Sequence, residues 1–330
     1  MSRRFISTAR LGLLFPALVL ATALEAETVH AQPFCLEKVM RLVVPFPAGG
    51  PVDSVARLIS EPLQQALGQS VIIENRSGAS GTVGTGYVAQ QPGNGCTILL
   101  SYDTHGVNPA LLTDLPYDTL KDFKPVMLLG TVSNVLVAHP SNPWMTFADL
   151  VAAAKQKGDI ACATGGIGTV AHLSMKVIEQ NYGFQLVYVP YRGGASAVQD
   201  VMGGHVPLMF GSVLSVSPLV RDGRVRALFQ TGTKRDKLLP NVPTLAELGH
   251  PELSIVSWVG IFMPASTPDE LATRLNGVMA AILRDETLLS RLGEIGIQVV
   301  ASSPPALQSF VESEISRWTD VVKRYDIKSP

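Results

Sequence analysis

Short apolar runs and longer stretches with helical spacing alternate along the chain. Residues 39–46 form a β-branched run that predicts a strand, and residues 52–67 place apolar side chains at the spacing of an amphipathic helix. A strand over 70–75, a glycine-rich start to a second helix at 76–91 and a strand over 96–101 continue the alternation. This βαβαβ order favours a parallel, doubly wound sheet, in which ligands bind at the carboxyl ends of the strands.

The same alternation returns after a long β-rich run at 131–141, which suits a strand that crosses between two units. Strands are predicted over 159–164 and 184–191, and a glycine turn and a helix follow each of them. Another long strand is expected over 253–266. The pattern therefore predicts a second unit that begins near residue 140.

The C-terminal part of the chain is predicted to be helical over 267–296 and 303–327. Thr267-Pro268 and Ser303-Pro304 provide N-cap and first-position signals for these helices.

Residues 1–31 have the pattern of a signal peptide and are not expected to belong to the fold. Arg3, Arg4 and Arg10 precede an apolar segment at 11–24 that is too short for a stable membrane anchor. Small residues follow, and cleavage is expected after Ala31 or, alternatively, after Ala26. Export through the Sec route is favoured over the twin-arginine route, and the mature protein is expected in the periplasm.

The composition narrows the class of protein. With 330 residues, 46% hydrophobic and 16% charged, the chain can form two ordinary domains around a well-buried core. A net charge of −1 and an aromatic content of 6% argue against nucleic acid as a partner.

Export makes a disulfide chemically possible, and the chain has three cysteines, Cys35, Cys96 and Cys162. Cys35 lies just before the first predicted strand, and Cys96 begins another. If these strands are parallel neighbours, both cysteines lie at the same end of the sheet and a Cys35–Cys96 bond becomes possible. Three unpaired thiols are the alternative.

Four junctions join a strand through a glycine turn to a helix, at 45–53, 76–86, 164–169 and 192–197. Such junctions direct backbone N–H groups and helix N-termini toward an anion. Four of them in one exported α/β protein favour two lobes that face each other across a cleft. A nucleotide is not favoured, because the chain has no G-x-x-x-x-G-K-[ST] motif and the glycines at 78–86 follow the second strand.

No catalytic, metal or cofactor site is predicted. The chain has no G-x-S-x-G elbow and no H-x-x-x-H pair, and none of its histidines lies beside a plausible nucleophile with an orienting acid. Asp53 is better explained as an acid in the first turn of its helix, which it stabilises while ordering the loop. His172, one turn into a helix, either faces the cleft or caps and packs its own helix.

The chain resembles the tripartite tricarboxylate transporter substrate-binding proteins, also called the Bordetella uptake gene (Bug) family, over about residues 33–328. The resemblance is carried by stretches that occur in the family's order. They include RLVVPFPAGGPVDSVAR, ALGQSVIIENRSGASGTVGTGYVA, NPALLTDLPYDTLKDFKPVMLLG, GIGTVAHLSMKVI, VPYRGGASAVQDVMGGHVPLMF, LLPNVPTLAELG and SWVGIFMPASTP.

This resemblance implies a two-lobed α/β fold, the type II or Venus-flytrap fold of periplasmic binding proteins. Each lobe is expected to be a mainly parallel sheet flanked by helices, with the ligand cleft between the lobes. The expected boundaries are 32–137 plus 228–330 for the first lobe and 138–227 for the second. The implied function is non-catalytic: a monomeric receptor captures a small di- or tricarboxylate or aromatic acid and delivers it to membrane transporter subunits, without a cofactor.

The resemblance also implies ligand-binding residues in loops of both lobes. The first strand–helix loop is expected to bind one carboxylate through main-chain groups and ordered waters, and the second lobe to hold the far end. Arg192 is either a bidentate partner of that end or a solvated loop residue, and Thr169 offers a hydroxyl donor, an ordinary N-cap or both. The expected set is Phe46, Ala48, Gly49, Asp53, Ser101, Asp103, Thr104, Gly166, Gly168, Thr169, His172, Tyr191, Arg192, Gly193, Ala195, Gly211 and Trp258.

Two departures from the family pattern bear on the ligand. Gly211-Ser212 stands where many relatives carry Asp-Asn, which removes a fixed negative charge and makes an amino acid a less expected ligand. The second departure lies in the loop after the third predicted strand, where relatives often have small residues and this chain has Tyr102, Asp103 and His105. These side chains are expected to enlarge and polarise the wall of the cleft that this loop forms. Two other functions stay open: a sensor that signals to a protein partner, and an exported hydrolase or isomerase, against which the missing nucleophile–base pair argues.

Overall fold

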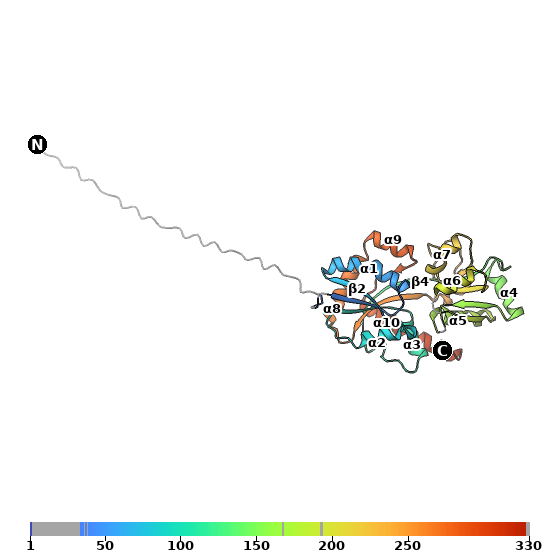
Figure 1. Cartoon of the computed structure of the whole chain (residues 1–330), viewed down its shortest axis with the longest axis horizontal. Coiled ribbons are helices and arrows are strands. Elements are labelled where there is room, and N and C mark those ends of the chain that lie inside the picture. Colours follow the sequence, from blue (N-terminus) through green and yellow to red (C-terminus); the bar gives the residue numbers. More distant parts are fainter. Residues whose placement is uncertain (2–33, 36, 38, 167, 192–193, 328–330) are drawn as a thin grey trace. The chain divides into compact units, whose positions relative to one another are not determined.

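The computed structural model describes residues 1, 34–35, 37, 39–166, 168–191 and 194–327. Its contacts divide the chain into Met1–Gln32 and Pro33–Pro330, and only the second unit is considered below. The predicted signal peptide, apart from Met1, lies outside the described residues. Within Pro33–Pro330, two β-sheets are each surrounded by helices (Figure 1).

The first sheet has six strands in the order β11-β4-β10-β3-β1-β2. Its strands β1 to β3 are parallel, whereas β10 runs antiparallel to both β3 and β4, and β11 runs antiparallel to β4. The bounds are β1 Val39–Val44, β2 Ser70–Asn75, β3 Thr97–Tyr102, β4 Phe123–Val132, β10 Ser257–Pro264 and β11 Gln298–Val299.

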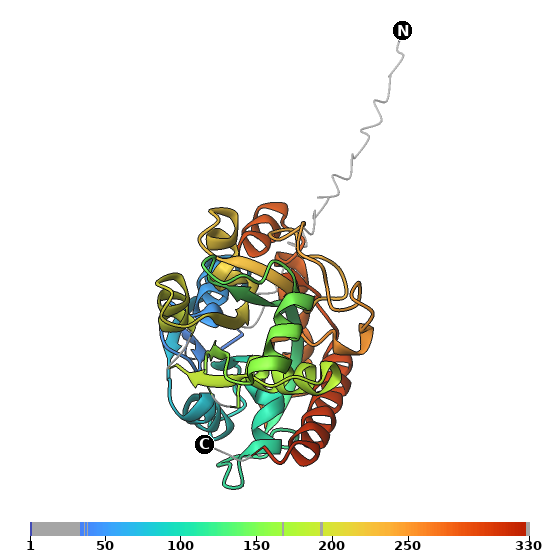
Figure 2. The same cartoon turned by 90° about the vertical axis from the view of Figure 1, so that its right-hand side faces the viewer.

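The second sheet has five strands in the order β7-β6-β8-β5-β9. Figure 2 turns this part of the chain, coloured green to yellow, toward the viewer. Three of its strands, β6, β7 and β8, are parallel, and β5 runs antiparallel to β8 and β9. The bounds are β5 Asn134–Ala138, β6 Ala161–Thr164, β7 Val187–Pro190, β8 Leu208–Ser212 and β9 Arg226–Gln230.

The predicted two-lobed α/β fold of type II is confirmed, although both sheets are mixed and not mainly parallel. In each lobe three parallel strands meet one strand that arrives from the other lobe, β10 in the first and β5 in the second, and that strand runs in the opposite direction. The first lobe contains the six-stranded sheet, and the second lobe contains the five-stranded sheet.

Helices cover both faces of each sheet, which explains why the strands read as continuous apolar runs. Leu42 and Leu100 pack toward α1, α8 and α9, and Val43 and Leu99 pack toward α2 and α10. Within the described residues no helix combines the length and apolarity needed to cross a bilayer. The bounds are α1 Pro51–Leu67, η1 Ala79–Gly81, α2 Thr82–Ala89, α3 Thr104–Leu111, α4 Phe147–Lys157, α5 Val170–Tyr182, α6 Gly194–Met202, α7 Val213–Arg221, η2 Pro251–Leu253, α8 Asp269–Ile282, α9 Glu286–Glu294 and α10 Pro304–Arg324.

The C-terminal helices differ in detail from the predicted ones. Ser303 is the N-cap of α10 with Pro304 in its first turn, as predicted. At α8, however, Pro268 occupies the N-cap position, one residue later than expected, and Thr267 is not the cap. The predicted helix over 267–296 is two helices, because α8 ends at Ile282 and Asp285 caps α9 through a hydrogen bond from the backbone N–H of Leu288.

The chain changes sheets at different residues from those expected. The run 131–141 contains two strands, since β4 ends at Val132 and β5 begins at Asn134 in the other sheet. The chain also returns to the first lobe later than the expected boundary between residues 227 and 228. Strand β9 still belongs to the second sheet, and Thr244 forms a β-bridge with its last residue, Gln230. The next strand of the first sheet, β10, begins only at Ser257. A pattern of hydrophobic residues cannot reveal the first change, because both strands are equally apolar.

A shared apolar cluster joins the two lobes. Val107 and Leu111 of α3 pack with Val170 and Leu173 of α5, and Trp318 of α10 completes the contact. All five side chains are less than a tenth exposed. The lobes are therefore in direct contact along the side that carries α3, α5 and α10.

Cys35 and Cys96 form a disulfide with their Cα atoms 4.8 Å apart, which confirms that pairing. Cys162 is free and buried in the second lobe. The bond closes a segment with a sequence separation of 61 residues, which contains the whole β1–α1–β2–α2 unit.

Removing this disulfide should lower the free energy of unfolding. Closing a loop of this length restricts the unfolded chain, so the Cys35→Ala/Cys96→Ala variant should lose about 2–4 kcal/mol in guanidinium unfolding. Cys162→Ala, which opens no covalent loop, is the control and should lose less. An unchanged unfolding midpoint in the double variant would show that the bond does not constrain the chain.

Candidate ligand-binding site

Six helices begin at the carboxyl ends of the six parallel strands. In the first lobe β1, β2 and β3 lead into α1, α2 and α3, and in the second lobe β6, β7 and β8 lead into α5, α6 and α7. The chain passes between the sheets twice, from β4 to β5 and from β9 to β10, and both connections lie at this same end. In the first sheet, Val132 at the end of β4 pairs with Ser257 at the start of β10, beside the end of β3. In the second sheet, Asn134 at the start of β5 pairs with Ser212 at the end of β8. Only Ser133 separates β4 from β5, so the carboxyl ends of the two sheets are neighbours. Helix N-termini carry partial positive charge, and this end suits an anion.

Asp53 organises the loop between β1 and α1. Its carboxylate is 1% exposed and accepts hydrogen bonds from the Gly49 N–H at 2.8 Å, from Arg57 Nε at 2.7 Å and from Asn75 Nδ2 at 3.0 Å. Burial raises the pKa of Asp53, but the hydrogen bonds from Arg57, Gly49 and Asn75 outweigh it and hold the pKa below its ordinary value. The buried carboxylate is therefore ionised and ties the loop to α1 and β2.

The first loop has few backbone donors left for a ligand. Gly49 donates to Asp53, Gly50 donates to the carbonyl of Pro47 at 3.3 Å, and the prolines have no N–H. For the N–H groups of Phe46 and Ala48, the described residues supply no acceptor. These two groups are the loop's available donors.

The second loop, between β2 and α2, packs directly on the first. Ala79 and Ser80 adopt left-handed backbone conformations with φ of 43° and 54°, which L residues rarely do. Asn108 of α3 donates to the Ser80 carbonyl at 3.1 Å and holds this turn. Gly84 has no room for a side chain, because a Cβ would lie 2.8 Å from the Cα of Pro45.

The third loop lies beside the first. Tyr102, at the end of β3, packs edge to face against Phe46 with ring centroids 6.1 Å apart. Asp103 is 2% exposed and is hydrogen-bonded with Ser257; burial, together with the charge of Glu314, raises its pKa to about 7. Ser101 and Thr104 are also buried. Asp103 thus lies behind the wall and does not polarise its surface.

His105 does not contribute to the wall as expected. Its ring packs among Tyr117, Phe123 and Phe262, and neither ring nitrogen has a hydrogen-bond partner. Burial lowers the pKa of His105 to about 3, so the ring is neutral at physiological pH. The sequence pattern missed this because position 105 falls on the core side of α3.

In the second lobe, Thr169 and His172 are both engaged at the start of α5. The Thr169 hydroxyl accepts from the His172 N–H at 3.3 Å and donates to the Gly166 carbonyl at 2.9 Å. His172 Nδ1 accepts from the Gly168 N–H at 3.2 Å, and its ring packs edge-on against Tyr188. Burial and then the Lys176 charge lower the pKa of His172 to about 4. Both residues therefore have capping roles, in line with one of the two predicted alternatives for each.

The remaining expected residues are placed differently. Tyr191 donates its hydroxyl to Asp200, which raises the pKa of Tyr191 to about 12. Ala195 is exposed at the start of α6, whereas Arg192 and Gly193 lie outside the described residues. Gly211 lies at the end of β8, next to Ser212, which caps α7 by accepting from the backbone N–H of Leu214 at 3.2 Å.

Trp258 has no exposed surface. It packs against Phe262 and Phe310 in the core of the first lobe, and so it supports β10 and does not line a surface. In contrast, Phe46 of the first loop does contact Tyr102.

Three residues that were not predicted hold these loops through hydrogen bonds. They are Asn75, Asn108 and Arg57. A signal for Asn75 was present, since a polar amide ends an apolar strand at its carboxyl end. For Asn108 there was none, because its acceptor lies 28 residues earlier in the chain.

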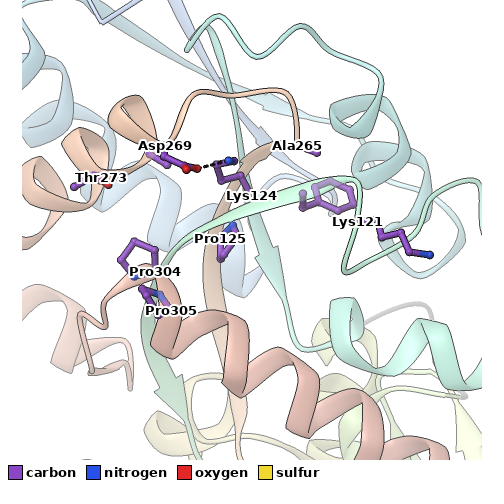
Figure 3. A pocket seen from close by; sticks show the side chains of 10 residues that line it. Lys121, Lys124, Pro125, Ala265, Asp269, Thr273, Pro304 and Pro305 are labelled. Atoms are coloured by element: carbon purple, nitrogen blue, oxygen red, sulfur yellow. Dashed lines mark hydrogen bonds and ion pairs between the residues drawn. The ribbon is translucent and has the colours of Figure 1, made fainter.

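Two pockets of the structure contain no residue of the three loops of the first lobe. The pocket in Figure 3 is lined by Lys124, Asp269, Pro304 and Pro305 among others, and Lys124 forms an ion pair with Asp269 across it. It lies where β4 begins and β10 ends, at the opposite end of the first sheet from the ligand loops. The other pocket is lined by α5 residues and by Tyr325, Asp326 and Ile327, and includes His172.

Among the described residues, no group of three or more His, Cys, Asp or Glu side chains lies close enough to hold a metal ion. The chemistry that the geometry supports is hydrogen bonding to an anion by backbone groups at helix N-termini.

The pH dependence of stability should reveal the buried His105. Its folded-state pKa of about 3 lies below the ordinary value of about 6.5, so the unfolded chain binds more protons between these values. The stabilisation due to neutral His105 is complete above about pH 6.5 and decreases as the pH falls. Wild type should therefore lose about 2 kcal/mol more than His105→Phe between pH 6.5 and 4.5 in urea unfolding. His139→Gln, at the surface, is the control; parallel curves for wild type and His105→Phe would contradict the prediction.

Comparison with known proteins agrees with the arrangement of strands and loops. The sequence profile described as "Tripartite tricarboxylate transporter family receptor" matches residues 55–327. Protein BugT of Bordetella pertussis is 32% identical over 321 residues, which are 96% of this chain and 97% of that protein.

Two solved structures are similar throughout. The structure of R. palustris Rpa4515 with adipate has a TM-score of 0.82 and 35% identity, and covers 88% of this chain and 98% of its own. The structure of MatC from Rhodopseudomonas palustris with bound malate has a TM-score of 0.78 and 33% identity, and covers 86% and 98%.

Proposed function

The chain belongs to the receptor family of the tripartite tricarboxylate transporters, and on this premise we propose that it is a periplasmic receptor for a small organic dicarboxylate. The observation that carries the proposal is the set of six helix N-termini at the adjoining carboxyl ends of the two sheets. Adipate and malate, the ligands in two similar structures, are both dicarboxylates.

The first lobe binds one carboxylate of the ligand. The N–H groups of Phe46 and Ala48 donate to it, and the N-terminus of α1 adds its partial positive charge. Asp53 holds the loop in place from behind. Arg57 is bound to Asp53, so the first loop recognises the carboxylate mainly by backbone groups.

The second lobe binds the far end of the ligand through the starts of α5, α6 and α7. Gly166, Gly168 and Tyr191 belong to the turns before α5 and α6, and Gly211 lies at the end of β8, just before α7. The Thr169 hydroxyl acts indirectly, because its proton is donated to Gly166. Arg192 remains a predicted partner of this end of the ligand.

Binding does not require a chemical step in this proposal. His105 is enclosed by aromatic rings, and His172 is engaged with Gly168, so neither serves as a general base in the described structure. Residues 1–31 supply the export signal, and the bound acid is passed to the membrane subunits of a transporter. One chain contributes all the loops, so a monomer suffices.

Ligand screening tests the proposal. Adipate or malate should bind saturably in isothermal titration calorimetry, and a ligand at a hundredfold excess over its Kd should stabilise the protein by about 2.7 kcal/mol. Aspartate and glutamate should bind at least tenfold more weakly, because Gly211-Ser212 offers no carboxylate to an ammonium group. Tight binding of either amino acid would contradict this specificity. If no mono-, di- or tricarboxylate binds, the proposed function is wrong.

A further inference from the structure

Asn75 is the last residue of β2, in parallel register with Val44, the last residue of β1. From this position its side chain reaches into the neighbouring loop. Nδ2 donates one hydrogen bond to the Phe46 carbonyl at 3.1 Å and another to Asp53 Oδ1 at 3.0 Å. Both hydrogens of the amide are used, and Asn75 is partly buried.

The two acceptors lie on either side of Ala48. Phe46 is bound by Asn75 directly, and Gly49 is bound by the other oxygen of the same Asp53 carboxylate at 2.8 Å. The backbone between these points contains the Ala48 N–H, one of the loop's two available donors. Asn75 thus holds the loop directly at Phe46 and, through Asp53, at Gly49.

Position 75 needs an uncharged side chain that can donate two hydrogen bonds. One acceptor is a carbonyl and the other an ionised carboxylate, so an aspartate at 75 would bring two acceptors beside them, and a serine would satisfy only one. Arg57 cannot replace the amide, because in the described structure it donates only to the two oxygens of Asp53, at 2.7 and 3.4 Å, and not to the Phe46 carbonyl. The backbone hydrogen bonds between β1 and β2 do not replace it either. The bond from the Arg76 N–H reaches the Val44 carbonyl, which precedes the first residue of the loop.

We propose that Asn75 is a positioning residue for the first carboxylate subsite. It holds residues 46–49 in the conformation that presents the Phe46 and Ala48 N–H groups, so that the loop is ordered before the ligand arrives. The inference rests on the proposed function for the identity of the ligand, but the ordering of the loop itself does not depend on it.

The Asn75→Ala variant tests the inference, and Asn276→Ala is its matched control. Asn276 also donates two hydrogen bonds through Nδ2, to the carbonyls of Val126 and Ser302 at 2.8 Å each, in the same lobe but away from the loop. The Kd for adipate and for malate is measured by calorimetry well below both melting temperatures. Asn75→Ala should raise the Kd at least tenfold, and Asn276→Ala less than twofold. A purely structural role would lower both melting temperatures and leave the Kd of the folded protein unchanged, which would overturn the proposal.

Hydrogen exchange gives a readout without ligand. In Asn75→Ala the Gly49 amide should exchange at least tenfold faster than in wild type, and in Asn276→Ala at the wild-type rate. Unchanged exchange at Gly49 would refute the positioning role. If exchange behaves as expected but wild type binds neither dicarboxylate, the positioning role stands and the proposed ligand class is wrong.

A second variant covers the case in which Asn75→Ala does not fold. Asn75→Ser keeps one donor and a polar side chain, and it should give intermediate exchange at Gly49 and an intermediate Kd. Wild-type values for both quantities in Asn75→Ser would overturn the proposal.

Discussion

A single residue, Ser133, joins the longest strand of the first sheet to the first strand of the second. Because the connection is so short, the carboxyl ends of the two sheets must lie next to each other, and with them the six helix N-termini. Space around this connection is limited: a Cβ on Gly232 would lie 2.6 Å from Ser133 Oγ. The Asn134 N–H beside it donates to Thr231 and Asn134 Nδ2 donates to Ser257, whereas the buried Ser133 hydroxyl has no hydrogen-bond partner among the described residues. The proximity of the helix N-termini of the two lobes follows from this constraint.

A site for anions has to neutralise the acids around it. Asp53 lies directly behind the first loop, and its charge is compensated by Arg57 and by two further donors. Burial raises the pKa of Asp103 to about 7, which reduces its negative charge near neutral pH. Glu314 is 1% exposed and accepts from Arg317 and Trp318. The buried acids therefore oppose an incoming carboxylate less than their number suggests.

The sequence predicted what depends on neighbouring residues and missed what depends on distant ones. The βαβαβ start of the first lobe, the glycine turns and the role of Asp53 follow from local patterns, and the structure reproduces them. The cysteine pairing was correct because it needed only that β1 and β3 be parallel neighbours.

The wrong expectations involve contacts between segments far apart in the chain. His105 was expected in the wall, and the rings that enclose it come from β4, β10 and the loop before β4. The strand change at Ser133 occurs inside one apolar run, so nothing in the local pattern marks it. Asn75 was not selected because its importance lies in the acceptors that it joins, 29 and 22 residues earlier. In the proposed site backbone groups contact the ligand, and the side chains of Asp53 and Asn75 hold that backbone in place. A motif search looks for side chains that touch the ligand, and so it overlooks residues of this second kind.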